Sequence, residues 1–181
     1  MSRPITRLFP ILGLVLAACD KAPVDEDAGH GATLARTDAA LASQLAEVRR
    51  ATAPFQEFSA AVAAGYDTRI TECFSDSTAG GMGFHYGKVG LIDTIVHLSE
   101  PELLLYEPQS DGSFRLVAVE YIVPRPSWTE PEPPSLFGRP FHYNAVFDIW
   151  AFHAWVWQHN PSGVFADWNP LVTCQFADRV E

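Results

Sequence analysis

Three histidines and one glutamate are the side chains of this chain best suited to chemistry. His85 follows a run of glycines, His142 follows a proline-rich stretch, and His153 lies among tryptophans. Glu120 interrupts an apolar run, and a carboxylate there must be paired, hydrogen-bonded or bound to a metal, because burying it alone is costly. Neutral imidazoles with one carboxylate suit zinc, iron or copper. We therefore predict a metal or small-ligand site formed by His85, Glu120 and His153, with His142 as a further candidate ligand.

Met82 and His159 complete the candidates. Met82 lies three residues before His85, and a thioether beside an imidazole suits copper, although a single methionine more often fills a core. The histidines have neither His-Glu-x-x-His nor His-x-His spacing. A core histidine satisfied by a backbone carbonyl is the commoner role for His142 and His159. The metal site is thus a hypothesis that depends on the side chains meeting in the fold.

Three functions fit this residue set. The first is binding of a metal ion or small ligand through the histidines and Glu120. The second is a metal-dependent enzyme, an oxidoreductase or hydrolase, in which the ion activates water or dioxygen and Glu120 acts as base or ligand. The third is a structural module of the cell envelope without catalysis. No Gly-x-Ser-x-Gly motif occurs, which disfavours a serine nucleophile.

The N-terminus resembles a bacterial secretion signal. Arg3 and Arg7 precede an apolar run, residues 8–18, that is too short to span a bilayer. The run leads into Leu-Ala-Ala-Cys at 16–19, which resembles a lipobox. This resemblance implies cleavage before Cys19 and attachment of lipid to it, which would anchor the protein to a membrane. We expect it in the cell envelope, facing the periplasm or the cell exterior.

Composition predicts one globular domain behind this anchor. Residues 1–18 form the signal, residues 19–31 are polar, small and acidic as in a flexible tether, and residues 32–181 have the size of a single domain. Asp20 resembles a signal for retention at the inner membrane in hosts that sort lipoproteins this way. After cleavage, 10 basic and 22 acidic residues leave a net charge of −12. This charge disfavours nucleic acid as a partner, because neutralising phosphates needs clustered Lys and Arg.

Cys73 and Cys174 remain once Cys19 carries lipid. Outside the cytoplasm two such cysteines are expected to pair, and a bridge closing about 100 residues contributes about 4 to 5 kcal/mol in the loop-entropy account. The alternative is a pair of thiolate metal ligands. Zinc sites rich in cysteine generally have closely spaced ligand pairs, which these two cysteines lack.

Apolar residues from about Thr33 to Ala64 recur at helical spacing, which predicts an amphipathic helical region. Pro54 must kink or break this region near Thr52, and would then stand in the first turn of a second helix. Gly65 fits the helix stop. We expect the apolar stripe to pack on the core of the domain.

Residues 103–107 and 114–123 flank a turn-rich stretch and predict a β-hairpin. The second of these strands is apolar on both faces apart from Glu120, so we expect it at the centre of a sheet. The glycine-rich stretch 80–87 is expected to form a loop. Residues 124–140 contain six prolines and are expected to form a rigid loop over the core.

The last apolar segment leaves two structures open. Residues 144–160 have a helical pattern that ends at Asn160 and Pro161, so we favour a helix. A strand over 145–159 is the alternative, because His153, Trp155 and Trp157 also alternate. Together the patterns predict an α+β fold, in which an N-terminal helical region packs on a small, mainly antiparallel sheet.

Four motifs resemble a family of uncharacterised bacterial exported proteins. They are Gly-Met-Gly-Phe-His-Tyr at 81–86, Leu-Leu-Tyr-Glu-Pro at 104–108, Val-Ala-Val-Glu-Tyr at 117–121 and His-Ala-Trp-Val-Trp-Gln-His-Asn-Pro-Ser-Gly at 153–163. The resemblance covers roughly residues 45 to 175. It supports a single exported domain and implies no particular activity or cofactor.

Overall fold

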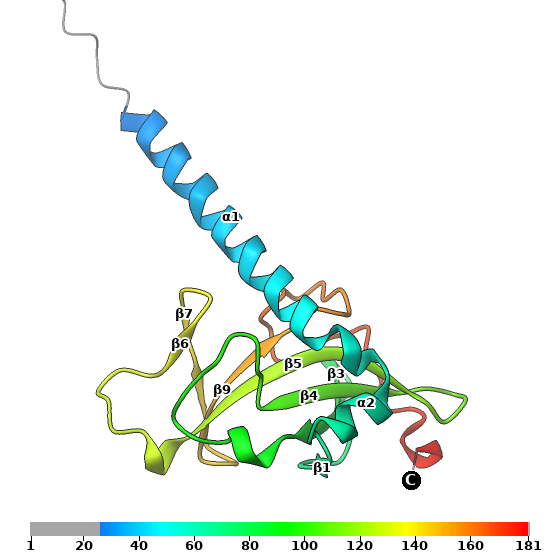
Figure 1. Cartoon of the computed structure of the whole chain (residues 1–181). Helices are drawn as coiled ribbons and strands as arrows, with labels where there is room; N and C mark the ends of the chain where they lie inside the picture. The colour runs from blue at the N-terminus through cyan, green and yellow to red at the C-terminus, as the bar shows by residue number, and fades with distance from the viewer. Residues whose placement is uncertain (1–25, 181) are drawn as a thin grey trace, which may run out of the picture.

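The computed structural model describes residues 26–180, in which both α-helices precede the strands (Figure 1). The signal and Cys19 lie outside the described residues. The helical elements are α1 (Glu26–Thr52), η1 (Ala53–Gln56), α2 (Phe58–Ala63), η2 (Val89–Leu91), η3 (Arg125–Ser127) and η4 (Ala177–Arg179). The strands are β1 (Thr68–Arg69), β2 (Phe74–Asp76), β3 (Gly80–Gly87), β4 (Leu103–Pro108), β5 (Phe114–Pro124), β6 (Ser135–Leu136), β7 (Arg139–Pro140), β8 (His142–Asn144) and β9 (Ile149–Ala154). The fold is α+β, as predicted.

The helical region is broken at the predicted place. α1 ends at Thr52 and Pro54 lies in the first turn of η1, because proline lacks the N–H that a continuing helix must donate. Gly65, at φ 98°, follows α2 and donates its N–H to the carbonyl of Val62 at 3.0 Å. This is the bonding of a Schellman motif, so Gly65 is the predicted helix stop.

α1 begins at Glu26, inside the stretch expected to be a flexible tether. Residues 26–31 are helical, so that part of the expected tether is corrected. After the first helical turn has formed, each residue added to the helix gains one backbone hydrogen bond. A helix can therefore continue beyond the residues that pack on the core. Figure 1 shows that the C-terminal end of α1 lies over the sheet while the rest projects away from it. Leu41, Leu45 and Val48 make the contacts with the core.

A seven-stranded antiparallel sheet forms the body of the domain. Its order is β1-β3-β4-β5-β9-β8, with β2 paired to β3 off this path. β4 and β5 are the predicted hairpin, and β5 is buried from Leu116 to Val123, as expected of a central strand. The proline-rich stretch carries only η3 and the short β6–β7 ribbon. Phe137 is buried in the core and holds this stretch against the sheet, as predicted.

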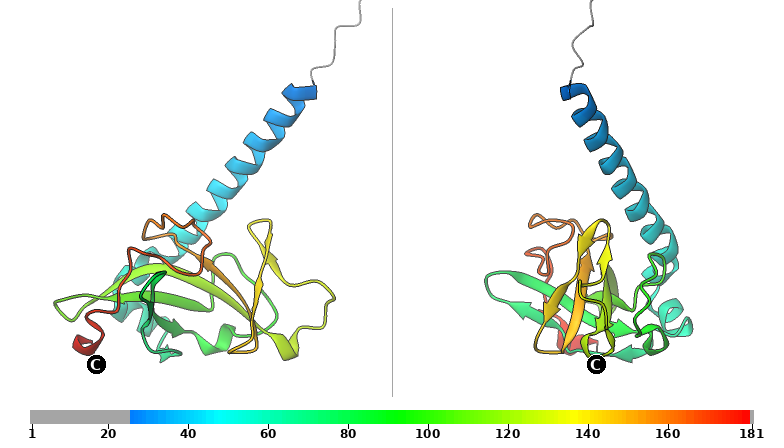
Figure 2. Two further views of the ribbon diagram at one scale, coloured as in Figure 1. Left: turned by 180° about the vertical axis from the view of Figure 1, so that it is seen from behind. Right: turned by 90° about the vertical axis from the view of Figure 1, so that its left-hand side faces the viewer.

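The sheet is covered on both faces. α1, η1 and α2 pack on the first face, over alternate residues such as Val119, Tyr121 and Phe152. On the second face, Trp155 and Val172 from the chain after β9 pack in a second buried cluster, and the right-hand view of Figure 2 shows part of this chain across the sheet from the helices. Because strand side chains alternate between faces, Glu120 and His153 project from the second face.

The glycine-rich stretch forms strand β3, so the expected loop is wrong. Neighbouring backbone passes too close for side chains: a Cβ on Gly81 would lie 2.8 Å from the carbonyl oxygen of Val172, and one on Gly83 would lie 2.4 Å from that of Tyr106. Gly83 also has φ 89°, which residues with a side chain rarely adopt. The glycines here permit close packing within and onto the sheet.

The favoured helix over residues 144–160 is wrong, because the chain forms β8, a turn and then β9. The strand alternative is right in type, but β9 covers only residues 149–154 of the 145–159 expected. β9 is covered on both faces, with Phe152 packed on the first and Ala151 on the second. A strand buried on both faces is apolar at nearly every position, and its sequence then shows no clear period of two. In the turn before β9, the side-chain oxygen of Asn144 accepts the N–H of Val146 at 3.0 Å.

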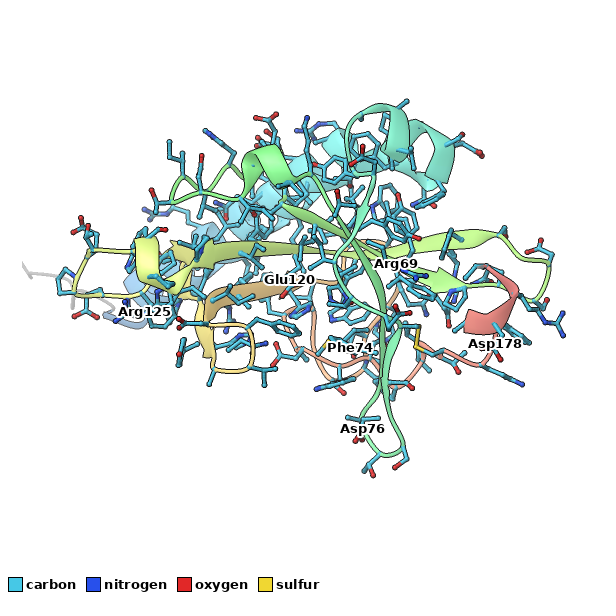
Figure 3. All side chains as sticks on the ribbon, turned by 90° about the horizontal axis from the view of Figure 1, so that it is seen from below. Arg69, Phe74, Asp76, Glu120, Arg125 and Asp178 are labelled. Atoms are coloured by element: carbon cyan, nitrogen blue, oxygen red, sulfur yellow. A yellow bond between two sulfur atoms is a disulfide. The ribbon has the colours of Figure 1, made fainter. Side chains whose placement is uncertain are left out.

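Cys73 and Cys174 form the predicted disulfide, with their Cα atoms 5.8 Å apart. It ties the segment before β2 to the C-terminal segment, and it is the yellow bond in Figure 3. The N–H of Thr173 donates to the buried carboxylate of Glu107 at 2.9 Å. The C-terminal segment is therefore fixed over the second face, and the cysteines are not metal ligands.

Candidate metal centre

Three strands bring the predicted ligands together on the second face. Glu120 in β5 is the register partner of His153 in β9, so their side chains are direct cross-strand neighbours. His85 in β3 lies on the other side of Glu120, beyond β4, where its register partner is Leu105. Figure 3 shows Glu120 near the middle of the sheet. The pairing of the strands thus brings His85 and His153, which are 68 positions apart in the sequence, to the same place on the sheet.

The ligand atoms have the spacing of a coordination site. Nε2 of His85 lies 3.4 Å from Oε2 of Glu120, and Nε2 of His153 lies 3.5 Å from Oε1 of Glu120. One ligand atom from each residue lies within 4.8 Å of the other two. Direct N–H···O hydrogen bonds are shorter, about 2.7 to 3.2 Å, whereas two ligands of a tetrahedral zinc ion lie about 3.4 Å apart. The distances therefore fit an ion between the groups better than a shared proton.

The remaining ring nitrogens are held by neighbouring side chains. Oγ1 of Thr71 is hydrogen-bonded to Nδ1 of His85 at 2.9 Å, and Oδ1 of Asp167 lies 3.3 Å from Nδ1 of His153. Such contacts fix the orientation of a metal-binding imidazole and direct its other nitrogen toward the ion. Both Nε2 atoms face Glu120 as a result.

All three side chains are buried, and their ionisation follows from that. Burial, with the charge of His153, lowers the pKa of His85 to about 3, so this ring is a neutral imidazole at ordinary pH. Burial raises the pKa of Glu120. Burial alone would lower the pKa of His153, but the charges of Glu120 and Asp167 raise it overall. Neutral imidazole is the form that binds metal ions, so His85 is in the binding form, whereas a metal ion that binds His153 must displace a proton from it.

Nε2 of His153 is buried and has no hydrogen-bond partner among residues 26–180. Leaving a buried polar atom unpaired costs about 1 to 3 kcal/mol. A cation between this nitrogen and Glu120 would satisfy it and would also neutralise the buried carboxylate. The unpaired nitrogen and the buried carboxylate lie on the two sides of the same 3.5 Å gap, so one cation there would satisfy both groups.

The other sequence candidates lie outside this group of three. His142 is about half exposed, and its Nε2 lies 3.6 Å from Oδ1 of Asp167, so it contacts the residue that holds His153. Met82 lines the adjoining cavity. His159 is exposed and lines a different hollow, beside Arg49. Sequence reasoning missed Thr71, which holds His85, and Asp167, which holds His153, because no motif or spacing marks either residue as part of the site.

A cavity of about 730 Å³ opens directly beside the three ligands. Apolar side chains form most of its wall, among them Ile70, Phe74, Ile122 and Trp168. Phe74, labelled in Figure 3, comes from β2 and lies near Glu120 in that view. The volume lies within the range of about 300 to 1,000 Å³ that is usual for small-molecule sites.

Comparisons with models of known protein families, with curated proteins and with solved structures found no match. Within residues 26–180, no helix combines the length and apolar character needed to cross a membrane. The function must therefore be argued from the chemistry of the site, because a fold alone does not specify an activity.

Proposed function

We propose that this domain binds a divalent transition-metal ion through His85, Glu120 and His153. The main support is the spacing of their ligand atoms, which lie within 4.8 Å of one another although they come from three strands of the sheet, β3, β5 and β9. Two imidazoles and one carboxylate are the donor set of non-haem iron(II) sites and of many catalytic zinc sites, both of which leave coordination positions open. Copper is the third candidate, with Met82 as a thioether ligand after side-chain rotation.

A metal-dependent enzyme, an oxidoreductase or hydrolase, is the second candidate function. The observation that favours it is the cavity, because His85, Glu120 and His153 all line it and a small molecule in it could reach an ion that they held. Glu120 lies between both histidines and would serve as a ligand in such an enzyme. The ion would then supply the activated water or dioxygen.

Metal analysis of the purified, exported protein tests the site. After removal of metal by a chelator, titration with Co²⁺ should give visible absorption that saturates at about one ion per chain, as expected for a single site of this kind. His85→Ala, Glu120→Ala and His153→Ala should each weaken binding by more than the roughly 10- to 100-fold typical of outer partners. His159→Ala removes an exposed histidine and should bind like the wild type.

Circular dichroism establishes that each variant is folded before binding is compared. A folded wild-type protein that binds much less than one equivalent of Co²⁺, Zn²⁺, Fe²⁺ and Cu²⁺ would contradict the proposal. So would equal affinities in His85→Ala and His159→Ala. Either result would favour a structural module of the cell envelope.

We also propose that lipid on Cys19 holds this domain at a membrane of the cell envelope, facing the periplasm or the exterior. The lipobox-like residues 16–19 support this, and so does the disulfide, because disulfides persist outside the reducing cytoplasm. Cys19→Ala should move the protein from the membrane fraction to the soluble fraction and remove the lipid mass. A variant that stays in the membrane fraction contradicts the anchor.

A further inference from the structure

We infer that the cavity holds an uncharged, mainly apolar organic molecule whose one polar group lies against the His85, Glu120 and His153 site. This inference names the ligand class of the proposed metal site, and the placement of the polar group rests on that proposal. The apolar body of the ligand follows from the wall of the cavity alone.

The first support is the distribution of polar groups in the cavity. The titratable side chains on its wall are His85, Glu120, His142, His153 and Asp167, together with the phenol of Tyr143 near the mouth. The two other polar side chains with short polar groups, Thr71 and Asn144, already have partners in Nδ1 of His85 and the N–H of Val146. Apolar side chains make up most of the remaining wall: Ile70, Phe74 in β2, Met82 in β3, Leu103 in β4, Ile122 in β5 and Ile149 in β9. A bound molecule with a polar group far from the three ligands would bury that group against hydrocarbon, which is unfavourable.

The second support is charge. No lysine or arginine lines the cavity within the described part of the chain, and its carboxylates are Glu120 and Asp167. An anionic group on the body of a ligand would have no counter-ion and would approach two negative charges. Burying an unpaired charge costs far more than burying an uncharged ring. The wall therefore selects against anions at every point away from the metal site.

The third support is the mouth of the cavity. Eight large hydrophobic residues are exposed within the described chain, and four of them, Ile70, Tyr143, Val146 and Phe147, line this cavity. Val146 is 85% exposed at the tip of the β8–β9 turn, and the ring of Phe147 lies 6.2 Å from that of Phe74. Exposed apolar side chains gathered at one opening are typical of binding sites for apolar molecules.

Two dyes with the same ring skeleton test the apolar body. N-phenyl-1-naphthylamine is uncharged, and 8-anilinonaphthalene-1-sulfonate carries one negative charge. Fluorescence titration should give one site for the uncharged dye and an affinity at least about tenfold lower for the sulfonate. Equal affinities, or tighter binding of the sulfonate, would overturn the inference.

A charge variant locates the dye. Ile70→Arg places a cation at the mouth, and should raise the affinity of the sulfonate relative to the uncharged dye by about tenfold. Val89→Arg is the matched control, because Val89 is also exposed but does not line the cavity. If both variants shift the ratio equally, the dyes bind elsewhere and the inference fails.

Cobalt-loaded protein tests the position of the polar group. Addition of 1-naphthol should change the visible absorption of the ion, whereas naphthalene, which lacks the hydroxyl, should bind without changing it. An unchanged spectrum at saturating naphthol overturns this placement. Dye binding is measured with and without metal, so that a protein that selects the uncharged dye but binds no metal would refute the proposed metal site and leave the apolar pocket in place.

Discussion

Glu102 offers the sharpest test of the energetics of this fold. It lies immediately before β4 and is 1% exposed, and its Oε2 accepts the N–H of Ile122 at 3.2 Å. No ion pair involving it occurs within the described residues. Burial, with the charges of Asp93 and Glu120, raises its pKa from 4.5 to about 8 despite that hydrogen bond. The folded protein therefore keeps a proton on Glu102 that the unfolded chain releases.

The sign and size of the effect follow from proton linkage. A group whose pKa is raised by folding stabilises the folded state below its unfolded pKa, and that contribution is lost as the pH rises through the folded pKa. The window here runs from 4.5 to about 8. At about 1.4 kcal/mol per pH unit, this interval gives a ceiling of about 5 kcal/mol, which relaxation and water access reduce. Glu102→Gln keeps an oxygen for the N–H of Ile122 and removes the charge.

We expect Glu102→Gln to match the wild type within about 1 kcal/mol near pH 5 and to exceed its free energy of unfolding by about 2 to 5 kcal/mol near pH 9. Urea denaturation at both pH values, with the disulfide intact, measures this difference. Glu130→Gln, at an exposed position of the proline-rich loop, controls for the loss of one negative charge. If Glu102→Gln gains no more stability than Glu130→Gln between the two pH values, folding does not raise the pKa of Glu102 as proposed.

Three further predictions concern the site and the frame that holds it. Asp167→Asn should lower metal affinity about 10- to 100-fold, because it weakens the contact that orients His153; a chelator competition that gives wild-type affinity would show that the contact is dispensable. Replacing both Cys73 and Cys174 by serine should cost about 2 to 5 kcal/mol of stability in urea denaturation, and an unchanged midpoint would mean that the bridge constrains little. Gly83→Ala should lower the melting temperature markedly, since its Cβ would lie 2.4 Å from the Tyr106 carbonyl oxygen at φ 89°; a protein as stable as the wild type would refute that packing.

Local signals predicted the parts of the fold that local chemistry determines. Pro54 breaks a helix because it lacks an N–H, and Gly65 ends one because it adopts positive φ, whatever surrounds them. The β4–β5 hairpin could also be predicted from the sequence, because its two apolar strands flank a turn-rich stretch. The disulfide followed from the number of cysteines left in an exported chain.

Strands β3 and β9 were missed because distant segments determine them. Gly81 and Gly83 suggest a flexible loop until Val172 and Tyr106 are seen to press on them from elsewhere in the chain. β9 is covered on both faces, which erases the alternation that identifies a strand. Neither fact is contained in a short window of sequence.

The residues of the candidate site were predicted from their types, and the register of the strands brings them together. His85, Glu120 and His153 were chosen because histidines and an isolated carboxylate are conspicuous in apolar or glycine-rich surroundings. Whether they met depended on the antiparallel pairing of β3, β4, β5 and β9, which brings one position from each of three strands to one place. Asp167 was missed because an acidic residue in an irregular segment has no local mark of its role.

The two faces of the sheet differ in role: the first carries most of the hydrophobic core, and the second carries the candidate site. The first face carries a buried cluster of 14 residues with both helices packed on it, whereas the cluster on the second face has eight residues and lies beside the cavity. The second face contains a cavity and three buried polar side chains, so it contributes less hydrophobic stabilisation than a fully packed apolar face would. The disulfide and the Glu107 contact with Thr173 hold the C-terminal segment where that packing is incomplete. The second face can therefore keep an open, ligand-lined pocket because the first face and the covalent bridge maintain the fold.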